Sequence, residues 1–162
     1  METDRLNALF SLSLLDTPPE ERFDRLTRIA VAVFGTAIST VTLIDHDRQW
    51  HKACIGVGSR EDDRAVSFCS VAIEKPEPLI VPDATQDPRF AENRLVTGPP
   101  GIRAYMGIPL TTATGFRVGT LGTFGRPEAS DAARTAETAL EAGDCAAVSA
   151  AVVTLRAAVE AD

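Results

Sequence analysis

Two pairs of short, β-branched segments set the strongest limit on how this chain can fold. Residues 38–45, ISTVTLID, and residues 49–57, QWHKACIGV, are separated by a tight polar turn. Residues 102–112 and 116–125 form a second pair around an Ala-Thr-Gly turn at 113–115. Strand-like runs joined by short turns are typical of antiparallel β-hairpins. We therefore expect two hairpins in one antiparallel sheet.

The segment before the first hairpin has the periodicity of helices. Apolar side chains within residues 5–15 recur three and four positions apart. A capping box that begins at Thr17, with Pro18 at the first helical position, predicts a second helix, and Gly35 is a typical helix stop. The N-terminal helices are therefore expected at about 5–34. The predicted apolar face of the second helix consists of Phe23, Leu26, Ile29, Ala30 and Val33.

The segment between the two hairpins is irregular and rich in turns. Residues 68–74 predict a short helix with Ser67 as its cap. Residues 78–83, PLIVPD, contain a brief strand that prolines limit on both sides. Asp87 and Pro88 are placed to start one helical turn. We expect this crossover to connect the hairpins without a long regular element.

The order of elements predicts an α+β domain. Residues 130–160 are rich in alanine and have helical spacing, which predicts a C-terminal helix. The sheet and the crossover then occupy about 38–125, with helices before and after them. Helices that are segregated from a central antiparallel sheet are expected to cover one of its faces. The whole chain, 1–162, is interpreted as a single domain.

Composition excludes several classes of function. The chain has 162 residues, and 16 basic against 23 acidic side chains give a net charge of −7. Such an acidic surface repels phosphate backbones, so we expect no nucleic-acid partner. No apolar run approaches the roughly 18 residues that a membrane span needs. The N-terminus lacks the basic region of a signal peptide, so a cytoplasmic location and no membrane partner are predicted.

The cysteines indicate neither a disulfide framework nor a metal site. Cys54, Cys69 and Cys145 are odd in number, and no CxxC or HxxxH pair occurs. Reduced thiols in a cytoplasmic protein fit this pattern. We expect no metal and no cofactor.

Several motifs occur in the order found in bacterial GAF domains. They include LLDTPPEERFDRLTRIAVAVFGTAISTVTLID, RQWHKACIG, SFCSVAI, PLIVPDATQDPRFAENRLVTGPPGIRAYMGIPL and GTLG. From about Leu6 to Phe124 the chain resembles the GAF domains that precede diguanylate cyclases and sensor histidine kinases. The resemblance implies a PAS-related, six-stranded antiparallel sheet with helices on one face and a loop-roofed pocket on the other. It also implies a sensory, regulatory or dimerisation module, here a free-standing domain or a fragment.

One part of the last strand departs from the family pattern. Gly122 stands where the family often has cysteine, and Gly125 where it often has aspartate. Glycine packs no side chain and weakens a strand, so we expect a less stable strand end. Roles tied to those two family side chains do not carry over.

The resemblance places a small-molecule pocket beneath the crossover. For several candidate residues in this region, a structural role is favoured over ligand binding. Cys69 is more simply a small buried residue than a redox sensor, and Asp83, Arg89 and Asn93 can serve turns, caps and an ion pair with Asp87. The candidate ligand-binding residues are Cys69, Asp83, Arg89, Phe90, Asn93, Tyr105 and Thr120.

Three kinds of GAF chemistry are alternatives to a purely regulatory role. No cysteine is followed by histidine, which argues against a covalent bilin. His46 and His51 are more simply a surface and a satisfied histidine than haem ligands. Cys69 lacks an evident resolving partner for a free methionine sulfoxide reductase cycle, which stays the enzymatic alternative. We expect no enzymatic activity.

The terminal helices are the expected dimer interface. The apolar seam of the C-terminal helix and two leucines of the N-terminal helix suit a helical bundle between two chains. The candidate residues are Leu6, Leu9, Val148, Val152, Leu155 and Val159. The sequence thus predicts a sensory domain that binds an unknown small molecule, dimerises, or does both, and that acts on a signalling-protein partner. A degenerate domain that only dimerises is the further alternative.

Overall fold

The computed structural model describes residues 1–125. The predicted C-terminal helix lies outside the described residues. The same holds for four of the dimerisation candidates, which are Val148, Val152, Leu155 and Val159.

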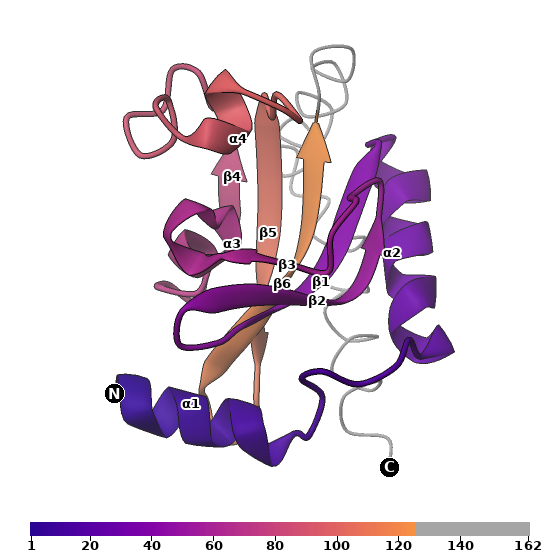
Figure 1. The fold of residues 1–162 in the computed structure, drawn as a ribbon, viewed down its shortest axis with the longest axis vertical. Coiled ribbons are helices and arrows are strands. Elements are labelled where there is room, and N and C mark those ends of the chain that lie inside the picture. Colours follow the sequence, from indigo (N-terminus) through magenta and orange to yellow (C-terminus); the bar gives the residue numbers. More distant parts are fainter. Residues whose placement is uncertain (126–162) are drawn as a thin grey trace.

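The centre of the fold is a six-stranded antiparallel sheet (Figure 1). Its strand order is β3-β2-β1-β6-β5-β4. Each predicted hairpin is present, since β1 pairs with β2 and β5 pairs with β6. The α+β fold and the antiparallel sheet are therefore confirmed. The strands are β1 Ile38–Ile44, β2 Arg48–Ile55, β3 Glu61–Asp63, β4 Leu79–Val81, β5 Ala104–Thr111 and β6 Arg117–Gly125.

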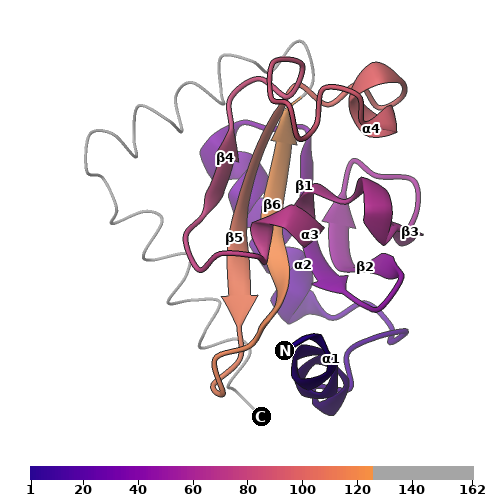
Figure 2. The ribbon, with the colours of Figure 1, turned by 90° about the vertical axis from the view of Figure 1, so that its left-hand side faces the viewer.

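Helices and loops cover both faces of this sheet. Figure 2 shows α2 behind the sheet, α3 and α4 on the opposite side, and α1 at one end. Among residues 1–125, no helix has both the length and the apolar character needed to cross a bilayer. The crossover between the hairpins, which contains α3 and α4, forms a layer on the side of the sheet opposite α2. The helices are α1 Glu2–Ser11, α2 Glu21–Phe34, α3 Phe68–Ala72 and α4 Arg94–Thr97, with a 3-10 turn η1 at Arg64–Val66.

The predicted start of α2 is wrong, whereas its end is confirmed. Gly35 follows the helix with φ 61, the left-handed conformation that glycine adopts without strain. The N-cap, however, is Glu20 and not Thr17. The Thr17 hydroxyl donates to Leu14 O at 2.6 Å and accepts from Lys52 Nζ at 2.6 Å. The Thr17 hydroxyl therefore binds the buried ammonium of Lys52, 35 residues away in sequence, and does not cap the helix.

A β-bulge at Lys52 decides which face of the sheet each β2 side chain uses. Ala53 opposes Val41 and His51 opposes Thr42, so Lys52 is the extra residue. The Lys52 ammonium is fully buried and bonds Glu20 at 2.5 Å and Pro18 O at 2.9 Å, on the α2 side. His51, one residue earlier, belongs to the opposite face.

The apolar face of α2 is narrower than its sequence predicts. Phe23, Leu26 and Ala30 are buried against the sheet, as expected. Ile29 and Val33 remain 45% and 59% exposed. Their burial was predicted from spacing alone, and among the described residues no element covers that side of the helix.

The α1 helix closes one end of the sheet. Leu9 is fully buried in a cluster with Leu43, Trp50 and Val118. Leu9 packs within its own domain and is thus not accessible to a second chain while α1 is docked. Leu6 is half-buried beside the same cluster. Dimerisation through the terminal helices stays a prediction.

Gly122 has a packing role that the sequence did not indicate. It pairs with Gly107 across β5 and β6, and the ring of Tyr105 lies over this pair. The Tyr105 ring also packs against Phe68 and Phe124, with centroids 5.3 and 4.8 Å away. The two glycines leave the space that this ring occupies, and β6 continues to Gly125 with no early end.

A Gly107→Ala variant tests this packing. A methyl group at Gly107 would overlap the Tyr105 hydroxyl and ring, which are enclosed by other side chains and cannot move aside. We expect a loss of about 1–3 kcal/mol in the free energy of unfolding, the usual range for an overfilled core. Urea denaturation measures it.

Gly58→Ala is the matched control. No atom lies within 4 Å of the Cβ that this change adds. Its effect should stay within about 0.5 kcal/mol. Equal stability of the two variants would contradict the proposed role of Gly107.

Candidate functional site

The first hairpin provides a polar floor on the face opposite α2. Thr40 and Thr42 alternate with Val41 along β1, so their side chains share this face. His51 opposes Thr42, and Gln49 opposes Ile44. The four polar residues therefore lie together on neighbouring strands beneath the crossover.

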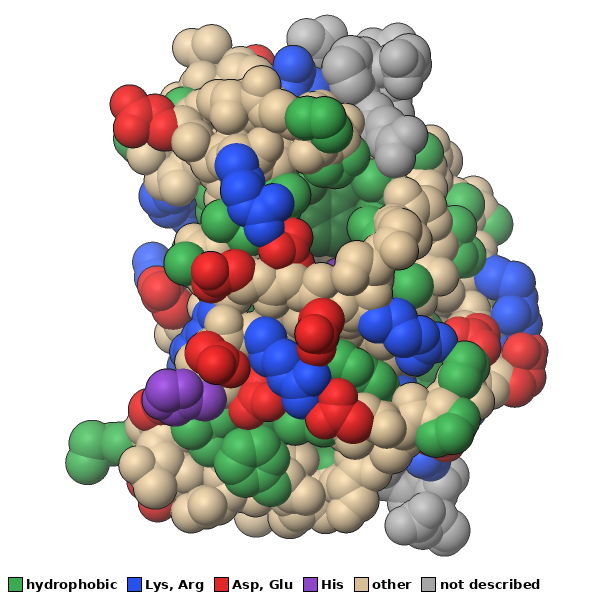
Figure 3. Space-filling view, viewed as in Figure 1, with side chains coloured by type: hydrophobic (Ala, Val, Ile, Leu, Met, Phe, Trp, Pro, Cys, Tyr) green, Lys and Arg blue, Asp and Glu red, His purple; other side chains and the backbone are tan. Residues whose placement is uncertain are grey.

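A cavity of about 520 Å³ lies over this floor. Thr40, Gln49 and His51 are among its lining residues. Figure 3 shows the hollow, in which hydrophobic side chains are visible and whose edge carries a basic and an acidic side chain in contact. The apolar part of the lining includes Ile38, Phe68, Leu95, Pro99, Ile102 and Phe124.

Among the residues of this lining, His51 has a pKa that is shifted strongly by its surroundings. Its Nδ1 lies 2.9 Å from Thr42 Oγ1, which lies 2.8 Å from Thr40 Oγ1. The side chain is only 6% exposed. Burial lowers the pKa of His51 from 6.5 to about 4. The imidazole is therefore neutral at pH 7 and offers one donor and one acceptor.

Gln49 is held by the first turn of α3. Ser67 Oγ donates to Gln49 Oε1 at 2.7 Å and accepts from Ser70 N at 3.0 Å, so the predicted Ser67 cap is confirmed. This hydroxyl directs its proton to the amide oxygen of Gln49, which leaves the amide NH₂ as the other end of the group. Gln49 is 6% exposed.

An ion pair crosses the mouth of the cavity. Arg94, at the start of α4, pairs with Asp62 of β3, and both residues line the cavity. Glu61 also belongs to the lining and pairs with Arg48 at 2.6 Å. The mouth thus carries two carboxylates and one guanidinium, all in ion pairs.

A cavity between an antiparallel sheet and a crossover layer is consistent with the resemblance noted above, and the sequence comparison is decisive. Residues 18–153 match the GAF domain family. The chain belongs to the GAF domain family.

Relatives of this GAF domain occur in bacterial signalling proteins. It is 43% identical over 110 residues to a protein of Pseudomonas aeruginosa named cyclic di-GMP phosphodiesterase. That match covers 68% of this chain and 19% of the relative, so the chain spans less than a fifth of that protein.

Solved structures support the fold alone, because their sequences are distant. The GAF domain of an Acinetobacter phosphoenolpyruvate-protein phosphotransferase matches with a TM-score of 0.57 and 14% identity, over 98% of this chain and 92% of that one. The nlh2 GAF domain of A. aeolicus matches with a TM-score of 0.54 and 12% identity, over 86% and 88%.

Four of the predicted ligand-binding residues form a cluster behind the cavity wall. Phe90 stacks on Phe68 with ring centroids 4.0 Å apart. The Tyr105 hydroxyl donates to Cys69 Sγ at 3.4 Å, and burial raises the pKa of Tyr105 well above its ordinary value. The fully buried Thr120 hydroxyl has no hydrogen-bond partner within residues 1–125. None of these four residues is part of the cavity lining; Phe68, whose ring packs against Phe90 and Tyr105, belongs to the lining.

The other three candidates serve the crossover itself. Asp83 accepts from Thr85 N at 2.9 Å, and Arg89 pairs with Asp87 at 2.6 Å. Asn93 caps α4 by accepting from Leu95 N at 2.9 Å. The structural alternative, local turn and cap chemistry, is confirmed for these residues, and none lines the cavity.

The cavity floor escaped prediction because its face could not be assigned. Alternation along a strand places the neighbours Trp50 and His51 on opposite faces of β2, but it does not say which face holds the pocket. Gln49 and Thr40 carried no separate signal. Only the pairing of β1 with β2, including the bulge, brings them together.

The low pKa of His51 predicts a distinct pH dependence of stability. In the unfolded chain His51 takes up a proton near pH 6.5, and in the folded domain only near pH 4. The unfolded state therefore binds more protons between these values, and stability falls as the pH falls through this window, by up to about 3 kcal/mol.

Urea unfolding at a series of pH values measures this effect. A His51→Phe variant should lose this part of the slope between pH 6.5 and 4. His46→Gln, which changes an exposed side chain in the β1–β2 turn, is the matched control. A His51→Phe variant with the slope of the unmodified protein would contradict the prediction.

Proposed function

We propose that this GAF domain is a non-enzymatic sensory module that binds a small molecule in the cavity above β1 and β2. The observation that supports it most is a cavity of about 520 Å³ with two nearly buried polar side chains, Gln49 and His51, in its lining. Ligand sites are typically concave, mostly apolar and provided with a few fixed polar groups.

The placement of the thiols supports a role without catalysis. Cys69 is fully buried and its sulfur accepts a hydrogen bond from Tyr105. Cys54 is half-buried, and burial raises the pKa of its thiol, which disfavours the reactive thiolate. Neither lines the cavity. Cys145 lies outside the described residues.

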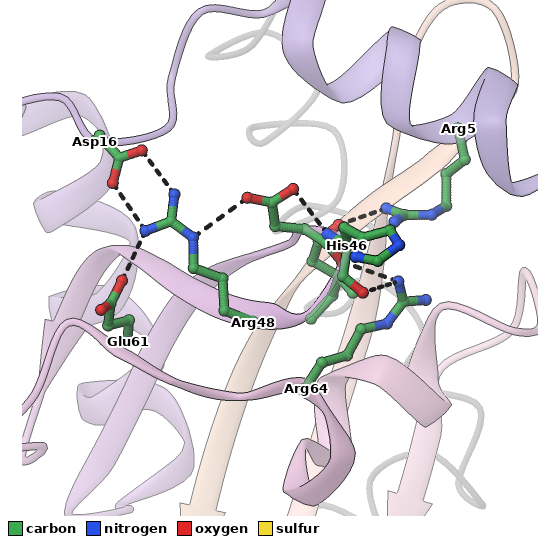
Figure 4. A network of polar contacts seen from close by, with 8 residues as sticks. Arg5, Asp16, His46, Arg48, Glu61 and Arg64 are labelled. Carbon is green, nitrogen blue, oxygen red and sulfur yellow. Dashed lines mark hydrogen bonds and ion pairs between the residues drawn. The ribbon is translucent and has the colours of Figure 1, made fainter.

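A network of charged groups provides a route from the cavity to the N-terminal helix (Figure 4). Arg48 bonds Glu61 of the cavity mouth at 2.6 Å and Asp16 of the α1–α2 linker at 2.6 Å. Movement of β3 would therefore pull on the linker. A ligand shifts such an element only if it binds two arrangements unequally.

Arg64 makes a second link, from α3 to α1. Its guanidinium bonds Glu2 of α1 at 2.7 Å, Ser70 of α3 at 3.3 Å and the carbonyl of Asp45 at 2.9 Å. Hydrogen bonds from Arg5 and then Arg64 lower the pKa of Glu2 to about 2. Glu2 therefore stays ionised across the physiological pH range, and α1 stays tied to the layer that covers the cavity.

The expected output is a signalling protein that reads the position of the terminal helices. The Pseudomonas aeruginosa relative is named for an activity on cyclic di-GMP, and the chain matches only a part of it. We propose that this domain regulates a separate output activity. Dimerisation through the terminal helices would transmit the change between two chains.

Thermal unfolding against a metabolite library tests ligand binding. At least one compound should raise the Tm of the unmodified protein in a concentration-dependent way, because ligands that bind only the folded state stabilise it. A Gly58→Trp variant, which adds bulk at the open mouth of the cavity, should respond less.

Gly58→Ala is the control for that variant and should respond like the unmodified protein. Compounds that stabilise all three proteins equally would bind outside the cavity. That result would contradict the proposed site.

Hydrogen exchange tests the link to α1. Arg64→Gln removes the bonds to Glu2 and should lower the free energy of local opening of α1 by about 1 kcal/mol, given the partial exposure of the pair. Arg89→Gln, which loses an ion pair within its own loop, should leave α1 unchanged. Equal exchange of α1 in both variants would contradict the link.

A further inference from the structure

Two polar groups of the cavity floor each have one fixed end and one end without a partner. Gln49 and His51 are two positions apart on β2, on the same face, so their Cα atoms lie about 7 Å apart. Gln49 Oε1 is bonded to Ser67, and His51 Nδ1 to Thr42. Within residues 1–125, neither Gln49 Nε2 nor His51 Nε2 has a hydrogen-bond partner.

The fixed ends determine what the other ends can recognise. Because the oxygen of Gln49 is bonded to Ser67, its amide NH₂ is a donor and needs an acceptor. His51 is neutral at pH 7, so its Nε2 takes part as a donor or as an acceptor according to tautomer. Neither nitrogen is among the buried atoms without a partner in the described part of the chain, so both are accessible from the cavity. A ligand that covers them therefore gains affinity if it bonds both ends and loses affinity if it leaves one unpaired.

The walls around these groups suit a flat molecule. Phe68 and Phe124 both line the cavity, with ring centroids 6.1 Å apart and planes at 81°. Leu95 and Ile102 add apolar surface without hydrogen-bonding side chains. A planar ring can contact these walls while its edge reaches β2.

The charges of the lining disfavour an anion. The cationic side chain among the lining residues is Arg94, and Asp62 already pairs with it. Glu61 is a second carboxylate of the lining, and His51 is neutral. A phosphate or carboxylate placed at the floor would therefore lose its hydration without gaining a positive partner.

We propose, on the basis of the function proposed above, that the cavity selects an uncharged planar molecule with an amide-like edge. The class includes carboxamides, lactams and neutral nitrogen heterocycles. Its acceptor binds the Gln49 amide, and its neighbouring donor or acceptor binds His51 Nε2. Molecules that depend on a phosphate for binding are excluded from this floor.

Three probes of one shape test the inference on the unmodified protein. Benzamide has the proposed edge, benzoate has the same outline with a negative charge, and benzamidine has donors but no acceptor for Gln49. Each is titrated against the ¹⁵N-labelled full chain, and the backbone amide signals of Gln49, His51 and Ile102 are followed. Benzamide should bind about tenfold more tightly than either other probe, the effect of one unsatisfied buried group.

A matched pair of variants assigns the selectivity to Gln49. Gln49→Met keeps the volume and removes the amide, and should weaken benzamide binding about tenfold, whereas benzamidine, which has no acceptor for this amide, should be unaffected. Gln86→Met makes the same change at an exposed position outside the cavity and should leave benzamide binding unchanged. Far-ultraviolet circular dichroism confirms that each variant is folded; the probe series on the unmodified protein stands independently of them.

The outcomes separate this inference from the proposed function. Equal binding of benzamide and benzoate overturns the inference. The inference is also overturned if none of the three probes binds while a library compound still stabilises the unmodified protein more than Gly58→Trp. In that case the proposed function stands. If no compound of either set acts through the cavity, both fail.

Discussion

The bulge at Lys52, and the burial of its ammonium, is the constraint on which the rest of the structure depends. A lysine that is fully buried needs partners for its charge, and here Glu20, Thr17 and Pro18 provide them. These contacts fix where α2 begins and hold the linker against β2. The same bulge sets the pairing in which His51 opposes Thr42. With this extra residue in β2, the Lys52 side chain lies on the face covered by α2 and the His51 side chain lies on the cavity face.

The aromatic cluster beside the cavity and the floor of the cavity differ in physical character. Phe68 of the cavity lining forms a close-packed aromatic cluster with Phe90 and Tyr105, and the glycines at 107 and 122 leave room for the Tyr105 ring. In front of it, the floor of β1 and β2 is polar, and each polar side chain is anchored at one end. A packed cluster gives rigidity, whereas an anchored polar floor gives recognition. The resemblance to GAF domains implies ligand-binding residues in the crossover, whereas the polar side chains Thr40, Gln49 and His51 that line the cavity lie on the sheet beneath it.

Local signals in the sequence predicted the elements well, and long-range contacts account for the misses. Ser67, Gly35 and the two hairpin turns act through their immediate neighbours, so their roles could be predicted. Thr17 had the pattern of a helix cap, but the ammonium of Lys52, distant in sequence, binds its hydroxyl. The burial of Ile29 and Val33 was inferred from spacing, and spacing does not say how wide a face the sheet will cover.

In the proposed complex, a ligand sits above β2 and bonds Gln49 Nε2 and His51 Nε2. A crystal structure of the protein with a compound that stabilises it tests this most directly. We expect density for the compound between the β1–β2 floor and Phe68, within hydrogen-bond distance of Gln49 Nε2 and His51 Nε2. Density elsewhere, with both side chains bonded to protein groups and the cavity closed, would contradict it.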